Sequence, residues 1–238
     1  MLFRSPGAGT ATVYAFSLQT SAGLVVDHNR VNNPGMITGG SFTAFDLNDV
    51  DNTAVTFNDA HSSGTGLTNH YLFSAANGST GVALKNNIFV SSMTASIDYM
   101  VIVDGASQAG FSADYNDYFS SNTLTLRWVP TNNSLAAWRT STLQDANTIS
   151  SHPFWTSTVA GSEDFHPGTR ALNGRYNPLS GAFDRQDTVS SPTIDKADPA
   201  LAFSNELALN GARANQGSYG NTDEASKTPR RLKVVQIR

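Results

Sequence analysis

The stretch Leu84-Lys85-Asn86-Asn87-Ile88-Phe89 decides the fold, because similar stretches occur at a constant distance on both sides of it. They are Val26-Asp27-His28-Asn29-Arg30-Val31, Val55-Thr56-Phe57-Asn58-Asp59-Ala60 and Ala113-Asp114-Tyr115-Asn116-Asp117-Tyr118. The central asparagines follow one another in steps of 29 residues: Asn29, Asn58, Asn87 and Asn116. A fixed period of this length is typical of a solenoid, in which each repeat forms one coil.

Apolar columns beside the asparagines support the period better than the asparagines do alone. Two columns are apolar or aromatic throughout and a third is mostly apolar: Val26, Val55, Leu84 and Ala113; Val31, Ala60, Phe89 and Tyr118; and Leu24, Thr53, Val82 and Phe111. Inward-facing residues stacked about 4.8 Å apart form the core of a parallel β-helix. Because Asn tolerates left-handed backbone geometry and its amide can bond to the next coil, we expect an asparagine ladder at a turn.

Composition limits the possible functions. Charged residues make up 14% of the 238-residue chain and the net charge is −4, whereas an average globular domain has about 25% charged residues. Since no basic stripe with interleaved aromatic residues precedes the tail, we expect no nucleic-acid partner. Cysteine is absent, which excludes disulfides and thiolate sites. No apolar run of about 18 residues occurs, so we expect no transmembrane helix.

The domain organisation follows from where the repeat stops. We expect a single β-helix domain over residues 1–226, with coils in 1–144 and a terminal coil and irregular cap in 145–226 that covers the last core face. We expect a frayed basic tail over 227–238. Because the N-terminal residues 1–16 lack the apolar core of a signal peptide, we interpret the chain as part of a longer protein. An uncapped first coil predicts pairing between chains, and so a homo-oligomer.

Motifs near the C-terminus resemble those of a known group of proteins. Ser191-Pro192-Thr193-Ile194-Asp195-Lys196-Ala197-Asp198-Pro199, Asn210-Gly211-Ala212-Arg213-Ala214-Asn215-Gln216-Gly217-Ser218-Tyr219-Gly220-Asn221-Thr222 and Asp164-Phe165-His166 resemble the motifs SPAIDAGDP, NGGRINMGAYGNT and DFHL of bacterial right-handed β-helix proteins. The resemblance covers residues 82–226 and implies a member of the pectate-lyase-like superfamily. These are cap and coil motifs, so they imply an extended glycan as partner and transfer no catalytic residue.

Outward-facing columns beside the ladder carry the candidate catalytic residues. The column two residues before each asparagine includes Asp27, Lys85 and Asp114. A lysine paired with an aspartate one coil away could abstract the proton next to a uronate carboxyl group, with Ca²⁺ neutralising the substrate. Asp59 follows its asparagine directly and His61 is nearby, so these could form an acid/base pair for glycoside hydrolysis or a metal site. The alternative is a solvated face of ion pairs and turn residues.

Three functions stay open at this point. The first is an extracellular glycan-directed module, as a fragment of a polysaccharide lyase or glycoside hydrolase, and the second is a non-catalytic adhesin or cell-surface binding module. A small-ester hydrolase is the third, although no nucleophile motif supports it. His152 and His166 are interpreted as structural. The three tryptophans Trp128, Trp138 and Trp155 could stack on sugar rings but more often fill the cap of an open core.

Overall fold

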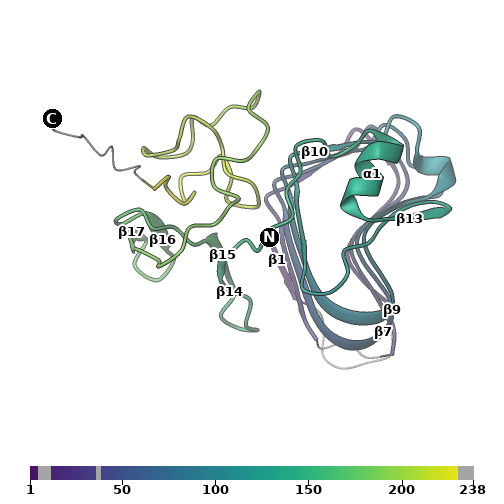
Figure 1. Ribbon diagram of the computed structural model, residues 1–238, viewed down its shortest axis with the longest axis horizontal. Coiled ribbons are helices and arrows are strands. Elements are labelled where there is room, and N and C mark those ends of the chain that lie inside the picture. Colours follow the sequence, from purple (N-terminus) through teal and green to yellow (C-terminus); the bar gives the residue numbers. More distant parts are fainter. Residues whose placement is uncertain (5–11, 36–38, 230–238) are drawn as a thin grey trace, which may run out of the picture.

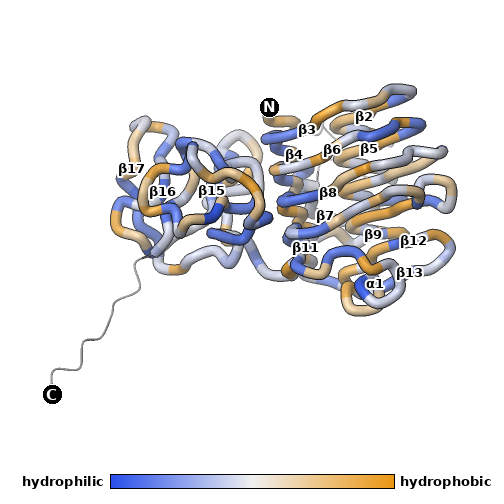
Figure 2. The backbone as a smooth tube through the Cα atoms, turned by 90° about the horizontal axis from the view of Figure 1, so that it is seen from above, coloured by the Kyte–Doolittle hydropathy of each residue, from blue (hydrophilic) through white to orange (hydrophobic). Residues whose placement is uncertain are grey.

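The computed structural model describes residues 1–4, 12–35 and 39–229, without the side chain of residue 96, and forms a parallel β-solenoid of about four turns. Figure 1 looks along the coils, and a second, less regular module that contains β15 to β17 lies to one side of them. In Figure 2 the coils appear as stacked rungs, with the N-terminus at one end and helix α1 at the other. The predicted all-β solenoid with coils of about 29 residues is therefore confirmed.

Two parallel sheets build the walls. The smaller sheet takes one short strand from each coil: β3 (Val25–Asp27), β6 (Ala54–Thr56), β8 (Ala83–Lys85) and β10 (Ser112–Asp114). The larger sheet contains β1 (Leu2–Arg4), β2 (Thr12–Ala22), β4 (Arg30–Pro34), β5 (Ser41–Asp51), β7 (Asp59–Ala76), β9 (Ile88–Val103), β11 (Asp117–Ser120), β12 (Leu126–Trp128) and β13 (Thr131–Asn133). In the smaller sheet Val55 pairs with Leu84, 29 residues later, whereas Phe73 of β7 pairs with Val101 of β9 after only 28.

The turn between the two sheets differs from the prediction in one respect. The left-handed residue is the one before each asparagine, with φ of 53°, 52°, 59° and 56° at His28, Phe57, Asn86 and Tyr115. Each asparagine instead uses its side chain to bond to the neighbouring coil. Asn58, for example, donates from its backbone N at 3.0 Å and its amide Nδ2 at 3.0 Å to Oδ1 of Asn87. The expected ladder is therefore present, but the left-handed geometry belongs to the preceding residue.

The inward columns form the core as predicted, with one exception. All twelve column residues except Leu24, which is 36% exposed in the first coil, are buried. The far end of the core is closed by helix α1 (Leu135–Thr142), which begins after the N-cap Ser134 and buries Trp138. A short 3-10 helix, η1 (Gly105–Ser107), lies in the turn after β9. Residues 135–142 thus cover the last core face, ahead of the stretch 145–226 expected to do so.

Residues 149–229, which we call the C-terminal module, instead lie along the side of the coils. A return segment, which we define as residues 149–163, runs back across them from Asp117, which accepts a hydrogen bond from Ser151 N, to Arg4, which pairs with Glu163 at 2.5 Å. Residues 155–185 form two antiparallel hairpins: β14 (Trp155–Ser157) with β15 (Asp164–Pro167), and β16 (Arg175–Asn177) with β17 (Ala182–Arg185). Of the predicted tail, Lys227 and Thr228 are hydrogen-bonded to the module, and 230–238 lie outside the described residues.

Candidate functional site

The predicted column of Asp27, Lys85 and Asp114 is present, but Lys85 and Asp114 are each in contact with a residue from later in the chain. The three residues end β3, β8 and β10 and lie in one register of the smaller sheet, with Thr56 of β6 between Asp27 and Lys85. Lys85 Nζ lies 3.3 Å from a carboxylate oxygen of Asp198, which belongs to the C-terminal module. Asp114 accepts hydrogen bonds from the backbone N and side-chain Nδ2 of Asn147, at 2.7 and 2.8 Å. The predicted pairing of Lys85 with Asp114 is therefore wrong, because each has a partner from later in the chain.

Asp59, another predicted catalytic residue, is buried under the C-terminal module. Its Oδ2 accepts hydrogen bonds from the backbone N of Ser218 at 3.1 Å and from Ser218 Oγ at 2.5 Å. Asp117 lies two coils further in the same column, separated from Asp59 by Ile88, and accepts a bond from Ser151 N at 2.9 Å. Burial raises the pKa of both carboxyl groups to about 7. Both groups are packed beneath the module, so the predicted Asp59 is not placed to reach a substrate as the acid or base of a glycosidase.

His61, the fifth predicted residue, lies in a different environment and leads to a cavity. Its ring is mostly buried on β7, and Nδ1 is 2.8 Å from Oδ1 of Asn32 on β4. The amide of Asn32 is oriented by its own Nδ2, which donates to the carbonyl of Thr158 at 2.9 Å. Asn32 therefore presents an acceptor to His61, and Nδ1 of His61 carries the proton. Nε2 is left as a hydrogen-bond acceptor without a partner among the described residues.

The return segment supplies the opposite wall of this cavity, which has a volume of about 510 Å³. Three rings line it besides His61. Phe119 on β11 packs edge-on against His152 at 5.1 Å, and Trp155 on β14 packs edge-on against His61 at 6.4 Å. The remaining lining residues are apolar or carry hydroxyl groups: Val90, Ser92, Ser121, Pro153, Thr156, Ser157, Thr158 and Val159. We call this space the aromatic cavity.

The aromatic cavity has no formal charge at neutral pH. None of its lining residues is Asp, Glu, Lys or Arg. Burial, together with repulsion from His152, lowers the pKa of His61 to about 4, and burial lowers the pKa of His152. Nδ1 of His152 accepts a hydrogen bond from the backbone N of Phe154 at 2.9 Å, so its proton is on Nε2. One neutral histidine thus offers an acceptor and the other a donor, a pair that suits a ligand hydroxyl group.

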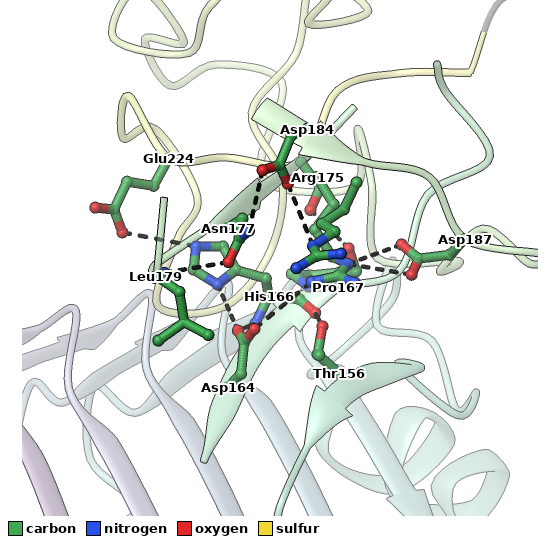
Figure 3. A network of polar contacts seen from close by, with 12 residues as sticks. Thr156, Asp164, His166, Pro167, Arg175, Asn177, Leu179, Asp184, Asp187 and Glu224 are labelled. Atoms are coloured by element: carbon green, nitrogen blue, oxygen red, sulfur yellow. Dashed lines mark hydrogen bonds and ion pairs between the residues drawn. The ribbon is translucent and has the colours of Figure 1, made fainter. Parts of the chain in front are cut away.

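A second group of histidine and carboxylate side chains lies inside the module and serves to hold it together. Figure 3 shows His166 between two carboxylates, with Asp164 at 2.5 Å from Nδ1 and Glu224 at 3.6 Å from Nε2. Arg175 pairs with both Asp164 and Asp187. Burial opposes ionisation of Asp164, but the hydrogen bonds and charge of His166 outweigh it and lower the pKa of that carboxyl group. His166 is fully buried, as a structural residue would be.

One further arrangement of catalytic side-chain types lacks catalytic geometry. His70 Nδ1 lies 2.7 Å from Asp98, but the nearby Ser91 hydroxyl bonds to Asp98 and not to the imidazole, so no serine nucleophile is activated. Among residues 1–4, 12–35 and 39–229, no group of three or more His, Asp or Glu side chains is placed to hold a metal ion. The expected Ca²⁺ therefore has no assigned ligands.

The sequence alone singles out His61 of the aromatic cavity and gives Trp155 sugar stacking as one of two possible roles. It does not indicate Phe119, and it favours a structural role for His152. A signal was nevertheless present, since His152-Pro153-Phe154-Trp155 concentrates rings and a proline in an otherwise polar stretch. Which strand that stretch would face depended on the path of the return segment.

Comparisons with known proteins give no information about the function of this chain. The chain matches no protein-family model, and comparison with curated proteins and with solved structures finds no match. Within the described part of the chain, no helix is long and apolar enough to cross a membrane.

Proposed function

We propose that this chain is a non-catalytic module that binds a neutral glycan in the aromatic cavity. The observation that carries the proposal is the chemistry of the lining: aromatic rings, hydroxyl groups and two neutral histidines with opposite hydrogen-bonding roles, without a charged side chain. Sugars combine apolar C–H faces, which pack on aromatic rings, with hydroxyl groups that both donate and accept. The resemblance to the pectate-lyase-like superfamily agrees with a glycan partner and an extracellular or cell-surface location.

The lining favours a neutral sugar over an acidic one. A uronate carboxylate buried here would have no cation beside it, and an unpaired buried charge is strongly unfavourable. Binding without cleavage is favoured because Asp59, expected to act in hydrolysis, and Lys85, expected to act in elimination, are both engaged by the module. A lyase or glycosidase fragment remains the alternative function, and end-to-end association of chains through the first coil remains a separate hypothesis.

The proposal is tested by measuring binding and cleavage on the same panel of glycans. Titration calorimetry with neutral hexasaccharides and with oligouronates should show binding of at least one neutral glycan and none of the oligouronates. Trp155→Ala should weaken that binding about tenfold, because stacking and burial of one sugar face contribute about 1.5 kcal/mol. His61→Ala should weaken it as well, since it removes the fixed acceptor.

The matched control is Tyr14→Ala, which removes an aromatic ring that is 47% exposed on β2, outside the aromatic cavity. Its affinity should equal that of the unmodified chain. Release of reducing ends or unsaturated products from any glycan would contradict the non-catalytic assignment. Equal affinity of Trp155→Ala and the unmodified chain would show that the aromatic cavity is not the binding site.

A further inference from the structure

A second cavity, larger than the aromatic one, lies on the C-terminal module and has a volume of about 970 Å³. Most of its lining is apolar: Phe154, Ala171, Leu172, Val189, Leu209 and Pro229. Leu172 is 78% exposed and Val189 is 42% exposed, although side chains of this kind are ordinarily covered. Exposed apolar side chains that gather around one concavity mark a binding surface. We call this space the apolar cavity.

One cation accompanies this apolar lining. Arg170 is the charged residue among the lining residues, and its guanidinium has no ion pair or hydrogen bond among the described residues. One candidate partner, Asp187, lines a smaller cavity together with Arg170 but is already engaged. Asp187 accepts from Arg175 Nε at 2.9 Å and from the backbone N of Thr169 at 2.8 Å. Within the described part of the chain, the positive charge of Arg170 is therefore available to a ligand.

The two cavities differ in chemistry and so select different ligands. The aromatic cavity offers hydroxyl groups and neutral imidazoles, whereas the apolar cavity offers aliphatic side chains and a guanidinium. Burying an aliphatic chain in the apolar cavity removes apolar surface of both partners from water. This favours binding by about 25 cal/mol of free energy for each Å² buried. A guanidinium binds a carboxylate through two parallel hydrogen bonds. A ligand that satisfies both features has an apolar tail and one carboxylate.

We propose that the apolar cavity binds an amphipathic carboxylate, a fatty acid of medium chain length, with its head group on Arg170 and its chain along Leu172, Val189 and Phe154. A cationic amphiphile places like charge against Arg170 and is rejected. A neutral amphiphile of the same length loses only the contact with the guanidinium. The two cavities share no lining residue, although Phe154 of the apolar cavity contacts the ring of His152 in the aromatic cavity at 4.9 Å.

The test uses the full chain and three probes that each carry a linear ten-carbon chain, below their micellar concentrations: decanoate, decanol and decyltrimethylammonium. Displacement of the fluorescent anion 8-anilinonaphthalene-1-sulfonate reports binding. We expect decanoate to bind best. Arg170→Gln should weaken the binding of decanoate about three- to fivefold and leave the affinity for decanol unchanged, because an exposed ion pair contributes up to about 1 kcal/mol. Arg170→Glu should reverse the preference in favour of decyltrimethylammonium.

Controls separate this site from general adsorption and from other occupants. Arg185→Gln removes another arginine of the same module, paired with Asp184 at 3.2 Å, and should leave all three affinities unchanged. Equal loss in Arg185→Gln and Arg170→Gln, or no preference among the probes, overturns the proposal. If sedimentation shows a dimer that Val189→Glu dissociates, a second copy of the chain is the occupant. If the probes bind only to a chain that ends at Pro229, residues 230–238 are the occupant.

Discussion

At the scale of single residues, the asparagine ladder makes an unfavourable turn possible. Phe57 and Tyr115 have large side chains in left-handed geometry, which such residues rarely adopt. The next residue compensates for this strain. Asn58 bonds through its side chain to the carbonyls of Val26 and Thr56 and to the next asparagine, so buried backbone groups at the corner are satisfied. The ladder ends at Asp145, whose Oδ1 accepts from Asn116 at 3.2 Å.

The middle of the ladder should be more sensitive to substitution than its exposed end. Asn58→Ala removes the side-chain acceptor of the backbone N of Asn29 and one donor to the carbonyl of Val26, and an unsatisfied buried group costs about 1–3 kcal/mol. We expect the free energy of unfolding to fall by about 2–4 kcal/mol in urea denaturation. Asn29→Ala, at the exposed end, is the control and should lose less. An equal loss in the two variants would contradict this account of the ladder.

At the scale of elements, helix α1 caps the C-terminal end of the solenoid core. A coil leaves an open apolar face at its end, and the next element must cover it. Trp138 is fully buried on α1, packs edge-on against Trp128 at 5.5 Å and donates from Nε1 to Asp145 at 2.9 Å. The helix is therefore joined both to the core and to the last member of the ladder. Two of the three tryptophans thus fill the end of the core, as expected, while Trp155 lines the aromatic cavity.

Removal of this ring should open the end of the core. Trp138→Ala leaves a large void and an unsatisfied acceptor on Asp145, so we expect a loss of about 3–5 kcal/mol in the free energy of unfolding. Trp138→Phe keeps most of the packing and should lose less. Trp155→Ala, which removes a partly exposed ring from the side of the molecule, serves as the control. A loss as large in Trp155→Ala as in Trp138→Ala would show that α1 is not the main closure of the core.

At the scale of the whole molecule, buried carboxyl groups lie where the module meets the coils. Asp59 and Asp117 are covered by Ser218 and by the return segment, and burial raises their pKa values to about 7. In the unfolded chain an aspartate has a pKa of about 3.9. Between these two values the folded protein keeps protons that the unfolded chain has lost. The free energy of unfolding should therefore fall as the pH rises from about 4 to 7, and level off above that.

The double variant Asp59→Asn/Asp117→Asn should flatten this dependence, because amide side chains stay neutral at every pH. Urea denaturation at pH 5 and pH 8 measures the difference. Some slope should remain, since burial also raises the pKa of Asp145 to about 6 and of Glu206 to about 7. Asp27→Asn, at an exposed position, is the control and should keep the slope of the unmodified chain. A double variant with an undiminished slope would contradict the assignment of these two groups.

The coils could be predicted from the sequence because their determinants are local and repeated. Leu84, Val55 and Val26 lie in one column because the chain returns to the same place every 29 residues, and a period is visible without coordinates. The same regularity predicted the ladder, although not which residue at the turn is left-handed.

The candidate site could not be predicted in the same way, because the return segment is not periodic. Asn32 and His61 are set by the repeat, but Trp155 and His152 reach them from residues far along the chain, through contacts such as that of Asn32 with Thr158. The same packing engaged Lys85 and covered Asp59, two residues whose sequence positions suggested catalysis. The amino-acid sequence by itself therefore determined how the chain coils and that it carries little charge. Only the tertiary structure decided which side chains a ligand can reach, since lateral packing joins residues that no period relates.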